Sequence, residues 1–382
     1  MKRVLIVAST NVRGGAEFVL QDYLRNNNFH EFFLYTAAQK SLEETYGSVL
    51  PPKAIIVSKY MRLISVRKHP FYAAYYTLRN LLHIHHYVKE KNIEILYGNN
   101  TPDMLLLCLY RRWVNRSIRV VLHIHDIVTR AMYLRFIQKF DAYVDAYIVP
   151  SQAGKRSIQA VISSKEKIHV IYNGVDIASK GKFEAAGNIR RRYNIPDGAV
   201  VLGFVGSISE IKRPDMFIRI VKALNKNNNR YFGLIIGAEA ENNWVKYIKR
   251  NIDENFLYLG EQERETLFCN IYPIMDVLLL TSDHDTFPTV ILEAMANNVL
   301  VCARRVDGVP EMVEDGITGV LWNYDADIDC IVDKIQAVLE DRQKVQYMKE
   351  QGELIVGKRF SPQKKRKEID WLLENLDDAQ EK

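Results

Sequence analysis

The sequence has few cysteines and no long apolar run, and both shortages restrict the kinds of protein it can encode. Its 382 residues contain four cysteines, Cys108, Cys269, Cys302 and Cys330, with no CxxC or Cys/His spacing. Isolated thiols argue against a disulfide scaffold and a zinc site, and they are typical of a reducing, cytoplasmic compartment. Apolar runs such as 199–206 are far shorter than the roughly 18 residues that a membrane-spanning helix requires.

No compositional bias points to a disordered, collagen-like or low-complexity protein. Glycine (19) and proline (11) are sparse, while 48% of the residues are hydrophobic and 26% are charged, as in ordinary globular chains. The length corresponds to roughly two to three domains. The apolar stretch 4–8 behind Met1-Lys2-Arg3 is too short for the core of a signal peptide, so we expect it to form a first β-strand.

Positive charge is concentrated in one half of the chain. Residues 1–180 carry 25 basic and 13 acidic side chains, a net charge of +12, whereas the remainder carries a net charge of −6. A basic half indicates an anionic partner, such as nucleic acid, an anionic lipid or a phosphorylated substrate. An ordinary asymmetry of the surface is the alternative.

Apolar runs rich in β-branched residues alternate with helical patterns along most of the chain. The runs are 4–9, 32–36, 93–97, 120–125, 146–150, 168–172, 200–206, 231–237, 256–260, 277–281 and 299–303. Because they do not alternate with polar residues, they predict parallel strands covered on both faces by helices, such as one from Pro214 to Leu224. The sequence therefore predicts an α/β fold of two doubly wound halves.

Two short motifs in the first half are candidates for ligand binding. Gly14-Gly15-Ala16-Glu17 opens an expected helix, so its backbone N–H groups could approach an anion, and a tight turn without ligand is the alternative. His125 ends another strand, at the edge where open parallel sheets bind ligands. A neutral imidazole there can hydrogen-bond a sugar hydroxyl or a leaving oxygen, and a purely structural role beside His123 is the alternative.

The most informative segment is 281–296. An apolar strand runs into a loop with two carboxylates, and a helix that starts at Pro288 or Thr289 presents Glu293 one turn later. Asp285 and Glu293 are eight positions apart, with the first N–H groups of the helix between them. Carboxylates accept hydrogen bonds from sugar hydroxyls and N–H groups donate to a diphosphate, so the segment predicts a sugar-nucleotide site.

With this segment the chain resembles the family 4 retaining glycosyltransferases of the GT-B fold, along most of its length. Asp285-Thr286-Phe287-Pro288 with Glu293 is similar to the family's pair of glutamates separated by seven residues, and Gly14 to Glu17 and His125-Asp126 are similar to its N-terminal motifs. Further matching segments are 150–151 with 170–176, 206–215, and 308–311 with 315–319.

The resemblance implies two Rossmann-like domains that face each other across a cleft. An acceptor-binding domain is expected at 1–180 and a donor-binding domain at 181–360, with the helix of 361–382 returning to the first domain. The boundary should fall within 176–195, before the turn signal Pro196-Asp197-Gly198. The resemblance also implies retention at the anomeric carbon, no metal ion and a nucleoside-diphosphate-sugar donor. We expect no cofactor and a UDP-sugar in preference to a GDP-sugar, and no motif specifies the base or the sugar of the donor.

The family pattern assigns roles to individual residues. His125 and Asp285 would be catalytic, with Asp285 contacting the hydroxyls of the donor sugar, and Glu293 would bind the ribose. The other donor-binding candidates are Gly14, Gly15, Ser207, Lys212, Arg213, Phe287, Pro288, Thr289 and Val290. Stabilisation of the leaving diphosphate and orientation of the reactants would supply most of the rate.

Two positions depart from the family pattern. Ser207 stands where an arginine usually follows the glycine of the phosphate loop, which leaves Lys212 as the retained cation and Arg213 as a candidate substitute. Asp285 stands where the first acidic residue of the pair is usually glutamate, so its carboxylate has a shorter reach.

Three other functions remain open on the sequence alone. Asp283-His284-Asp285 also resembles the Asp-x-Asp motif of the GT-A fold, which would bind Mn²⁺ or Mg²⁺. A sugar-nucleotide epimerase of the GT-B fold would use similar donor contacts without an acceptor. A non-enzymatic protein that binds an anionic surface would account for the basic half, although carboxylates in the second half would repel phosphate chains.

The acceptor is expected to be a glycan or a lipid-linked molecule, in surface-polysaccharide synthesis at the cytoplasmic face of a membrane. The segment from Lys59 to His86 interleaves basic with aromatic residues, namely Arg62, Arg67, Lys68 and Arg79 with Phe71, Tyr72, Tyr75 and Tyr76. This mixture suits peripheral binding to an anionic membrane surface, and packed tyrosines beside solvated arginines are the alternative. His83, His85 and His86 are expected on a helix surface rather than in a metal site.

Overall fold

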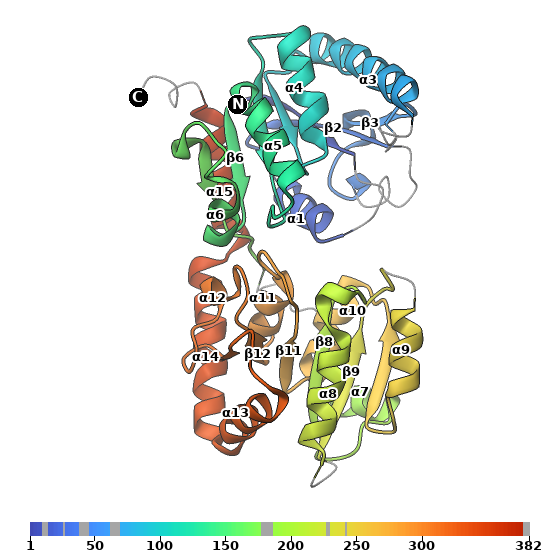
Figure 1. Cartoon of the computed structure of the whole chain (residues 1–382), viewed down its shortest axis with the longest axis vertical. Helices are drawn as coiled ribbons and strands as arrows, with labels where there is room; N and C mark the ends of the chain where they lie inside the picture. The colour runs from blue at the N-terminus through green and yellow to red at the C-terminus, as the bar shows by residue number, and fades with distance from the viewer. Residues whose placement is uncertain are drawn as a thin grey trace. The chain divides into compact units, whose positions relative to one another are not determined.

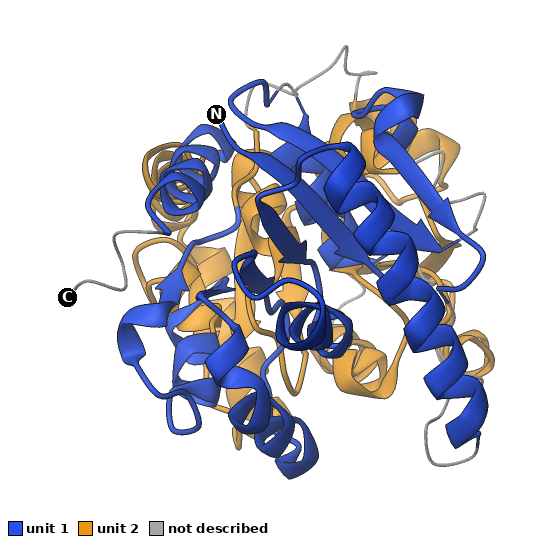
Figure 2. Ribbon diagram, turned by 90° about the horizontal axis from the view of Figure 1, so that it is seen from above, with its two compact units in different colours: residues 1–173, 362–382 blue, residues 174–361 orange. Residues whose placement is uncertain are grey.

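The computed structural model divides into two compact units. Residues 1–9, 14–25, 27–37, 46–61, 69–176, 186–226, 230–240 and 243–376 are described. Unit 1 comprises Met1–Asn173 and Pro362–Lys382, and unit 2 comprises Gly174–Ser361 (Figure 2). The first division thus lies seven residues before the expected 180/181 boundary. Part of the expected boundary, 177–185, and the cations Arg62, Arg67 and Lys68 lie outside the described residues.

Unit 1 is built around a seven-stranded parallel sheet in the order β3-β2-β1-β4-β5-β6-β7. Its strands are β1 Arg3–Ala8, β2 Glu31–Ala37, β3 Ile55–Ser58, β4 Ile95–Gly98, β5 Arg119–His123, β6 Ala146–Val149 and β7 Ile168–Val170. Its helices are α1 Gly15–Leu24, α3 Pro70–Glu90, α4 Asp103–Trp113, α5 Ala131–Phe140, α6 Gln152–Ile158 and α15 Pro362–Glu374.

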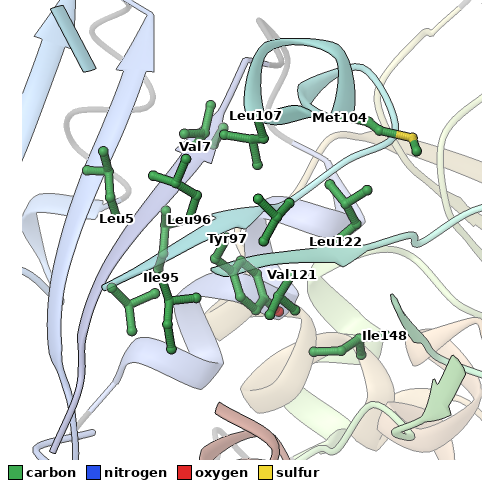
Figure 3. Packing of buried hydrophobic residues seen from close by; sticks show 14 of the residues in the cluster. Leu5, Val7, Ile95, Leu96, Tyr97, Met104, Leu107, Val121, Leu122 and Ile148 are labelled. Carbon is green, nitrogen blue, oxygen red and sulfur yellow. The ribbon is translucent and has the colours of Figure 1, made fainter. Parts of the chain in front are cut away.

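The core of unit 1 lies between its central strands and the helices that cover them. Figure 3 shows Leu5 of β1, Leu96 of β4 and Val121 of β5 among side chains that also come from α4, such as Leu107, and all four are fully buried. Burial of both faces explains why these strands are continuously apolar. The packing fixes the strands, and their carboxyl ends therefore present the loops that follow at one defined edge.

Unit 2 contains a six-stranded parallel sheet in the order β10-β9-β8-β11-β12-β13. Its strands are β8 Val200–Val205, β9 Tyr231–Ile236, β10 Phe256–Gly260, β11 Val277–Leu280, β12 Leu300–Arg304 and β13 Val320–Trp322. Its helices are α7 Ala186–Arg192, α8 Pro214–Leu224, α9 Trp244–Asn251, α10 Arg264–Thr266, α11 Thr289–Ala296, α12 Val309–Met312, α13 Ile328–Glu340 and α14 Arg342–Arg359.

The predicted fold class is confirmed, because the chain forms two parallel-sheet, Rossmann-like units. Each of the eleven expected runs overlaps a strand, and α8 has the expected bounds with its apolar face buried. The sequence missed β3 and β13, which are short strands at the edges of the two sheets.

Helix α15 belongs to unit 1, although it follows the whole of unit 2 in the sequence (Figure 1). It packs on α1, where the Tyr23 hydroxyl donates to Asp370 at 2.7 Å and the Asn27 amide donates to the same carboxylate at 3.1 Å. The ammonium of the buried Lys365 donates to the carbonyl of Val19 at 3.2 Å. Buried polar groups paired in this way fix the position of α15 on the unit.

The described helices and cysteines agree with the absence of a membrane-spanning helix and of a disulfide scaffold that the sequence predicts for this part of the chain. None of the helices in the described ranges has the combination of length and apolar character needed to cross a bilayer. All four cysteines are free thiols, and Cys108 and Cys302 are buried.

The ends of β8 and β9 approach each other too closely for a side chain. Gly206 and Gly237 both have positive φ, 154° and 155°, and a Cβ atom on Gly237 would lie 1.7 Å from the carbonyl oxygen of Gly206. The N–H of Gly206 also donates to the carbonyl of Ile236 at 3.0 Å. Glycine at 237 therefore determines the path of the loop after β8.

The variant Gly237→Ala is expected to destabilise unit 2 strongly, by more than roughly 4 kcal/mol, because the clash is with backbone and cannot relax through a rotamer. Gly198→Ala is the matched control, since Gly198 also has a positive φ (73°) but a Cβ there would meet nothing within 4 Å. The control should cost only about 1–2 kcal/mol of backbone strain. Urea unfolding measures both variants, and equal losses would contradict the close approach.

Candidate active site

Each sheet reverses its strand order beside its first strand, and this reversal is the natural place for a ligand. In unit 1, β1 lies between β2 and β4, and in unit 2, β8 lies between β9 and β11. Loops that leave the carboxyl ends of such neighbouring strands run to opposite faces and open a crevice between them. The loops after β1, β4, β8 and β11 therefore define where a site can form in each unit.

In unit 2 the loops after β8 and β11 are joined to each other. The N–H of Asp283 donates to the carbonyl of Ile211 at 2.8 Å, and the Thr281 hydroxyl lies 3.0 Å from the carbonyl oxygens of Lys212 and Arg213. Ser207 is exposed at the start of the first loop. The two loops consequently act as one surface, and residues 70 positions apart in sequence are held at fixed separations.

The predicted cation Lys212 and the predicted carboxylate Asp285 form a direct ion pair. Asp285 is held from its backbone as well, because its N–H donates to the Asp307 carboxylate at 2.9 Å and its carbonyl accepts from the N–H of Gly308 at 3.3 Å. The side chain of Asp285 is mostly buried and that of Lys212 is partly exposed. An anion that approaches Lys212 must therefore share the ammonium with Asp285.

Arg213, the candidate substitute for the missing arginine, is engaged elsewhere. Its guanidinium makes two 2.9 Å bonds to Asp215 and a 3.3 Å bond to Asp283, which also contacts Arg304. The bonds to Asp215, assisted by the charge of Asp283, raise the pKa of Arg213 further above its usual range. Two carboxylates thus compensate the charge of Arg213 in this structure.

Glu293 lies in α11 and is held by two residues that the sequence did not indicate. The Tyr272 hydroxyl donates to its Oε2 at 2.8 Å, and Arg264 lies 3.6 Å from its Oε1. Burial, followed by the nearby carboxylate of Glu293, raises the pKa of Tyr272 well above its usual value, so the phenol remains a donor. These contacts fix the orientation of the Glu293 carboxylate.

The remaining candidates of unit 2 precede or begin α11. Phe287 and Pro288 are buried, and the Phe287 ring packs edge-on against Phe360 with centroids 5.6 Å apart. Thr289 and Val290 are partly exposed in the first helical turn, where N–H groups have no acceptor within the helix. The buried pair thus supports the loop, and the next two residues offer backbone donors.

In unit 1 the paired glycines begin α1. The N–H of Gly14 donates to the side chain of the buried Glu17 at 3.0 Å, and Asn100 donates to the other oxygen of Glu17 at 3.5 Å. A Cβ atom on Gly15 would meet nothing within 4 Å. The backbone at Gly15 therefore borders open space at the carboxyl edge of the sheet.

His125 and His123 form a stacked pair whose ring centroids are 3.9 Å apart. The Nε2 atom of His125 lies 3.2 Å from the Asn99 side-chain oxygen, and the Nδ1 atom of His123 lies 2.7 Å from the Tyr97 hydroxyl. Burial, together with the positive charge of Lys365, lowers the pKa of His125 to about 3, and burial lowers that of His123 well below its usual value. Both rings are consequently neutral at physiological pH.

The same edge of unit 1 carries an unusual number of buried polar atoms. The Ser9 hydroxyl, the Tyr46 hydroxyl, the Asn99 amide nitrogen and the His123 Nε2 atom have no hydrogen-bond partner among the described residues. Asp103 accepts from the N–H groups of Ser9 and Asn100 at 3.0 Å each, and burial raises its pKa to about 7. Such a concentration of costly polar groups is typical of a functional site.

The sequence did not identify several of the residues described here. Asn99 and Asp103 follow β4, and Arg304 ends β12, so their position at the carboxyl ends of strands could have identified them as site candidates. Arg264 and Tyr272 stand in a segment after β10 that has no recognisable spacing.

The histidines of α3 and the acidic loops give no indication of a metal centre. Within the described ranges, no three His, Cys, Asp or Glu side chains are grouped to hold a metal ion. His86 is exposed, as expected, whereas His83 and His85 are partly buried, with each Nδ1 within 3.1 Å of a tyrosine hydroxyl.

Comparison with known proteins matches both halves of the chain to families. Residues 186–354 match the family model described as "Glycosyl transferases group 1", and residues 14–179 match the model described as "Glycosyltransferase Family 4". An uncharacterized 41.2 kDa protein in the cps region of Klebsiella pneumoniae is 24% identical over 340 residues, which cover 84% of this chain and 86% of the relative.

Two further proteins are similar, one in sequence over a shorter alignment and one in structure at lower sequence identity. The lipopolysaccharide 1,2-N-acetylglucosaminetransferase of Salmonella typhimurium is 26% identical over 262 residues, 65% of this chain and 66% of the relative. The crystal structure of Anabaena HepE in complex with UDP and glucose has a TM-score of 0.83 at 20% identity and covers 98% of this chain and 100% of that chain. Its likeness extends over both units and therefore concerns the whole fold.

The lowered pKa of His125 predicts that acid destabilises unit 1. Between about pH 3 and the ordinary value near 6.5, the unfolded chain binds a proton at this residue that the folded chain does not. The free energy of unfolding therefore falls as pH decreases through this window, by at most about 1.4 kcal/mol per pH unit for one histidine.

His125→Gln should make the fall shallower, because glutamine cannot be protonated. Thermal unfolding between pH 7 and pH 5 measures the slope, and His86→Gln, at an exposed histidine of the same unit, is the control. Identical slopes for His125→Gln and the unmodified chain would rule out a buried neutral imidazole at this position.

Proposed function

This chain is a member of glycosyltransferase family 4 with the GT-B fold, and we propose that it transfers a hexose-type sugar from a UDP-sugar to a glycan or lipid-linked acceptor, with retention at the anomeric carbon. The established fold excludes the GT-A alternative. The two aspartates of that motif differ in their contacts, since Asp283 is paired with Arg213 and Arg304 whereas Asp285 is paired with Lys212.

The Lys212–Asp285 ion pair carries the proposal for the donor site. It lies on loops that follow β8 and β11, the strands at which the order of the sheet reverses. Lys212 would stabilise the leaving diphosphate together with the first N–H groups of α11, at Thr289 and Val290. When the ammonium turns to the diphosphate, Asp285 would be released to accept hydrogen bonds from the donor sugar.

Glu293 would bind the ribose hydroxyls of the donor. Its carboxylate accepts two hydrogen bonds readily, and Tyr272 and Arg264 hold it in one orientation. A preference for UDP is supported by HepE, which was crystallised with UDP and glucose. Arg213 would act by fixing the loop, because its charge is already compensated by Asp215 and Asp283.

Unit 1 would recognise the acceptor. It would also supply the neutral imidazole of His125 as a catalytic group and the open backbone at Gly15 as a donor contact, both at the carboxyl edge of its sheet. We propose that it acts in the cytoplasm, in the synthesis of a surface polysaccharide. The synthetic role is supported by two relatives, the protein in the cps region of Klebsiella pneumoniae and the lipopolysaccharide 1,2-N-acetylglucosaminetransferase of Salmonella typhimurium. Positioned cations and N–H groups would supply the stabilisation that a metal ion supplies elsewhere, so we propose a reaction without metal or cofactor.

A panel of labelled nucleotide sugars tests the proposed activity. Each is incubated with the purified chain, with and without EDTA and with and without glycan or lipid-linked acceptors, and released nucleotide and glycosylated product are measured. We expect release of UDP that depends on acceptor and is unaffected by EDTA. Interconversion of the sugar without an acceptor would indicate the epimerase, loss of activity in EDTA would refute metal independence, and a product of inverted configuration would refute retention.

Opposite effects on nucleotide binding are expected from the two members of the ion pair. Lys212→Ala should weaken UDP binding and lower kcat/KM by about ten- to a hundredfold, since a charge-assisted contact contributes about 1.5–3 kcal/mol. Asp285→Asn should strengthen UDP binding, because the ammonium no longer has a carboxylate partner, while turnover falls. Calorimetric titration with UDP and steady-state kinetics separate the two quantities.

The exposed pair Lys222 and Asp253, 3.9 Å apart, provides matched controls. Lys222→Ala and Asp253→Asn should leave both UDP affinity and turnover near those of the unmodified chain. Weaker UDP binding by Asp285→Asn would contradict the competition between diphosphate and carboxylate for Lys212.

A further inference from the structure

Helix α3 of unit 1 carries a continuous apolar stripe that faces away from the core. Phe71, Tyr75, Leu78 and Leu82 are spaced by four, three and four residues, which places them on one face of the helix. Their exposed fractions are 89%, 52%, 55% and 57%. The opposite face is buried, with Leu81, Ile84 and Val88 in the core of the unit. The stripe extends the sequence prediction, which included Phe71 and Tyr75 but neither leucine.

The stripe lies in a part of the chain that has no negative charge. From Lys59 to Lys89 the sequence contains no aspartate or glutamate. Arg79 and His86 are exposed beside the stripe, and Lys89 stands at its far end. Glu90, at the end of α3, lies 3.3 Å from His86 and is also paired with Lys91. An apolar face whose other charged neighbours are basic is complementary to a surface that is both apolar and anionic.

A pocket of about 500 Å³ opens along the flank of the stripe, where β3 ends. Its polar lining consists of Lys59, Tyr60, Arg79, His83 and His86, and no carboxylate belongs to the lining among the described residues. The Lys59 ammonium and the Arg79 guanidinium lie 5.4 Å and 4.6 Å from the centre of the Tyr60 ring. Two cations are thus gathered on one ring, and neither is paired with a carboxylate among the residues that the structure describes.

The pocket and the stripe are parts of one surface. Leu82 belongs to both, since it lines the pocket and is exposed as the last member of the stripe. The stripe from Phe71 to Leu82 spans about 16 Å at 1.5 Å per residue, so several lipid headgroups could lie along it. A second copy of the chain is a poor occupant, because two such faces would bring cations together.

We propose that this face of α3 docks on an anionic phospholipid bilayer. The stripe enters the boundary between headgroups and acyl chains, and the phosphate of one headgroup enters the pocket between Lys59 and Arg79. This docking goes beyond the proposed sugar transfer and does not depend on it, because binding to vesicles requires neither donor nor acceptor.

Co-sedimentation of the full chain with vesicles tests the proposal. We expect binding to vesicles that contain phosphatidylglycerol and at least tenfold less binding to vesicles of phosphatidylcholine alone. Binding should decrease as salt is raised, because exposed charges are screened. Absence of binding to the anionic vesicles at low salt, or equal binding to both kinds, would overturn the proposal.

Matched variants locate the surface. Phe71→Ser combined with Leu78→Ser should reduce binding at least tenfold. Tyr347→Ser combined with Leu354→Ser is the control, since these residues are also seven positions apart on one helix, α14, and are 49% and 47% exposed. An equal loss in both double variants would show that the stripe is not the docking surface.

A second pair of variants tests the pocket. Lys59→Gln combined with Arg79→Gln should reduce binding to anionic vesicles at least tenfold, whereas Lys246→Gln combined with Lys249→Gln on the exposed face of α9 should leave it unchanged. Thermal unfolding verifies that each variant is folded. Retained vesicle binding by the Lys59 and Arg79 variant would refute the headgroup site, and a dimer dissolved by the stripe variant would identify a second copy as the occupant instead.

Discussion

The position of β1 between β2 and β4, and of β8 between β9 and β11, determines where this protein can bind ligands. Right-handed crossovers that leave one strand in opposite directions along the sheet put their helices on opposite faces. The loops that lead to those helices must separate, and they leave room at a single place on the carboxyl edge. Lys212 and Asp285 in unit 2, and Gly15 and Asn99 in unit 1, lie at these places. The strand order therefore determines which loops border the crevice, and the side chains of those loops bind the ligand.

Charge at the edge of unit 2 is paired almost throughout the described loops. Lys212 faces Asp285, and Asp283 lies between Arg213 and Arg304. Such pairs keep charged groups oriented without a ligand, which reduces the reorganisation required when a diphosphate arrives. The affinity for a diphosphate then depends on how readily Lys212 exchanges Asp285 for the diphosphate. This dependence is stronger here because Ser207, where the family pattern has an arginine, supplies no second cation.

Long, strongly patterned elements were predictable from the sequence, whereas edges and side-chain directions were not. The strand β8 and the helix α8 are continuous apolar or amphipathic segments. The missed strands β3 and β13 are short and lie at the sheet edges, although β7, which also has three residues at an edge, was predicted. Arg213 has a left-handed backbone, with φ of 53°, and its side chain pairs with Asp215, and neither feature could be predicted from the residue type. Likewise, the exposure of Leu78 follows only from knowing which face of α3 is packed. Tyr272 and Arg264 are near Glu293 through tertiary packing alone.

The docking of α15 on α1 has a consequence for the order in which the chain can fold during synthesis. Tyr23 and Asn27 emerge from the ribosome early, but Asp370, the carboxylate to which both donate, emerges only after all of unit 2 has been made. Unit 2 is a continuous segment and can close as soon as it is translated. The first unit to be translated is thus the last to be completed, and until α15 docks, the phenol of Tyr23 and the amide of Asn27 lack the carboxylate that they bind in the folded protein.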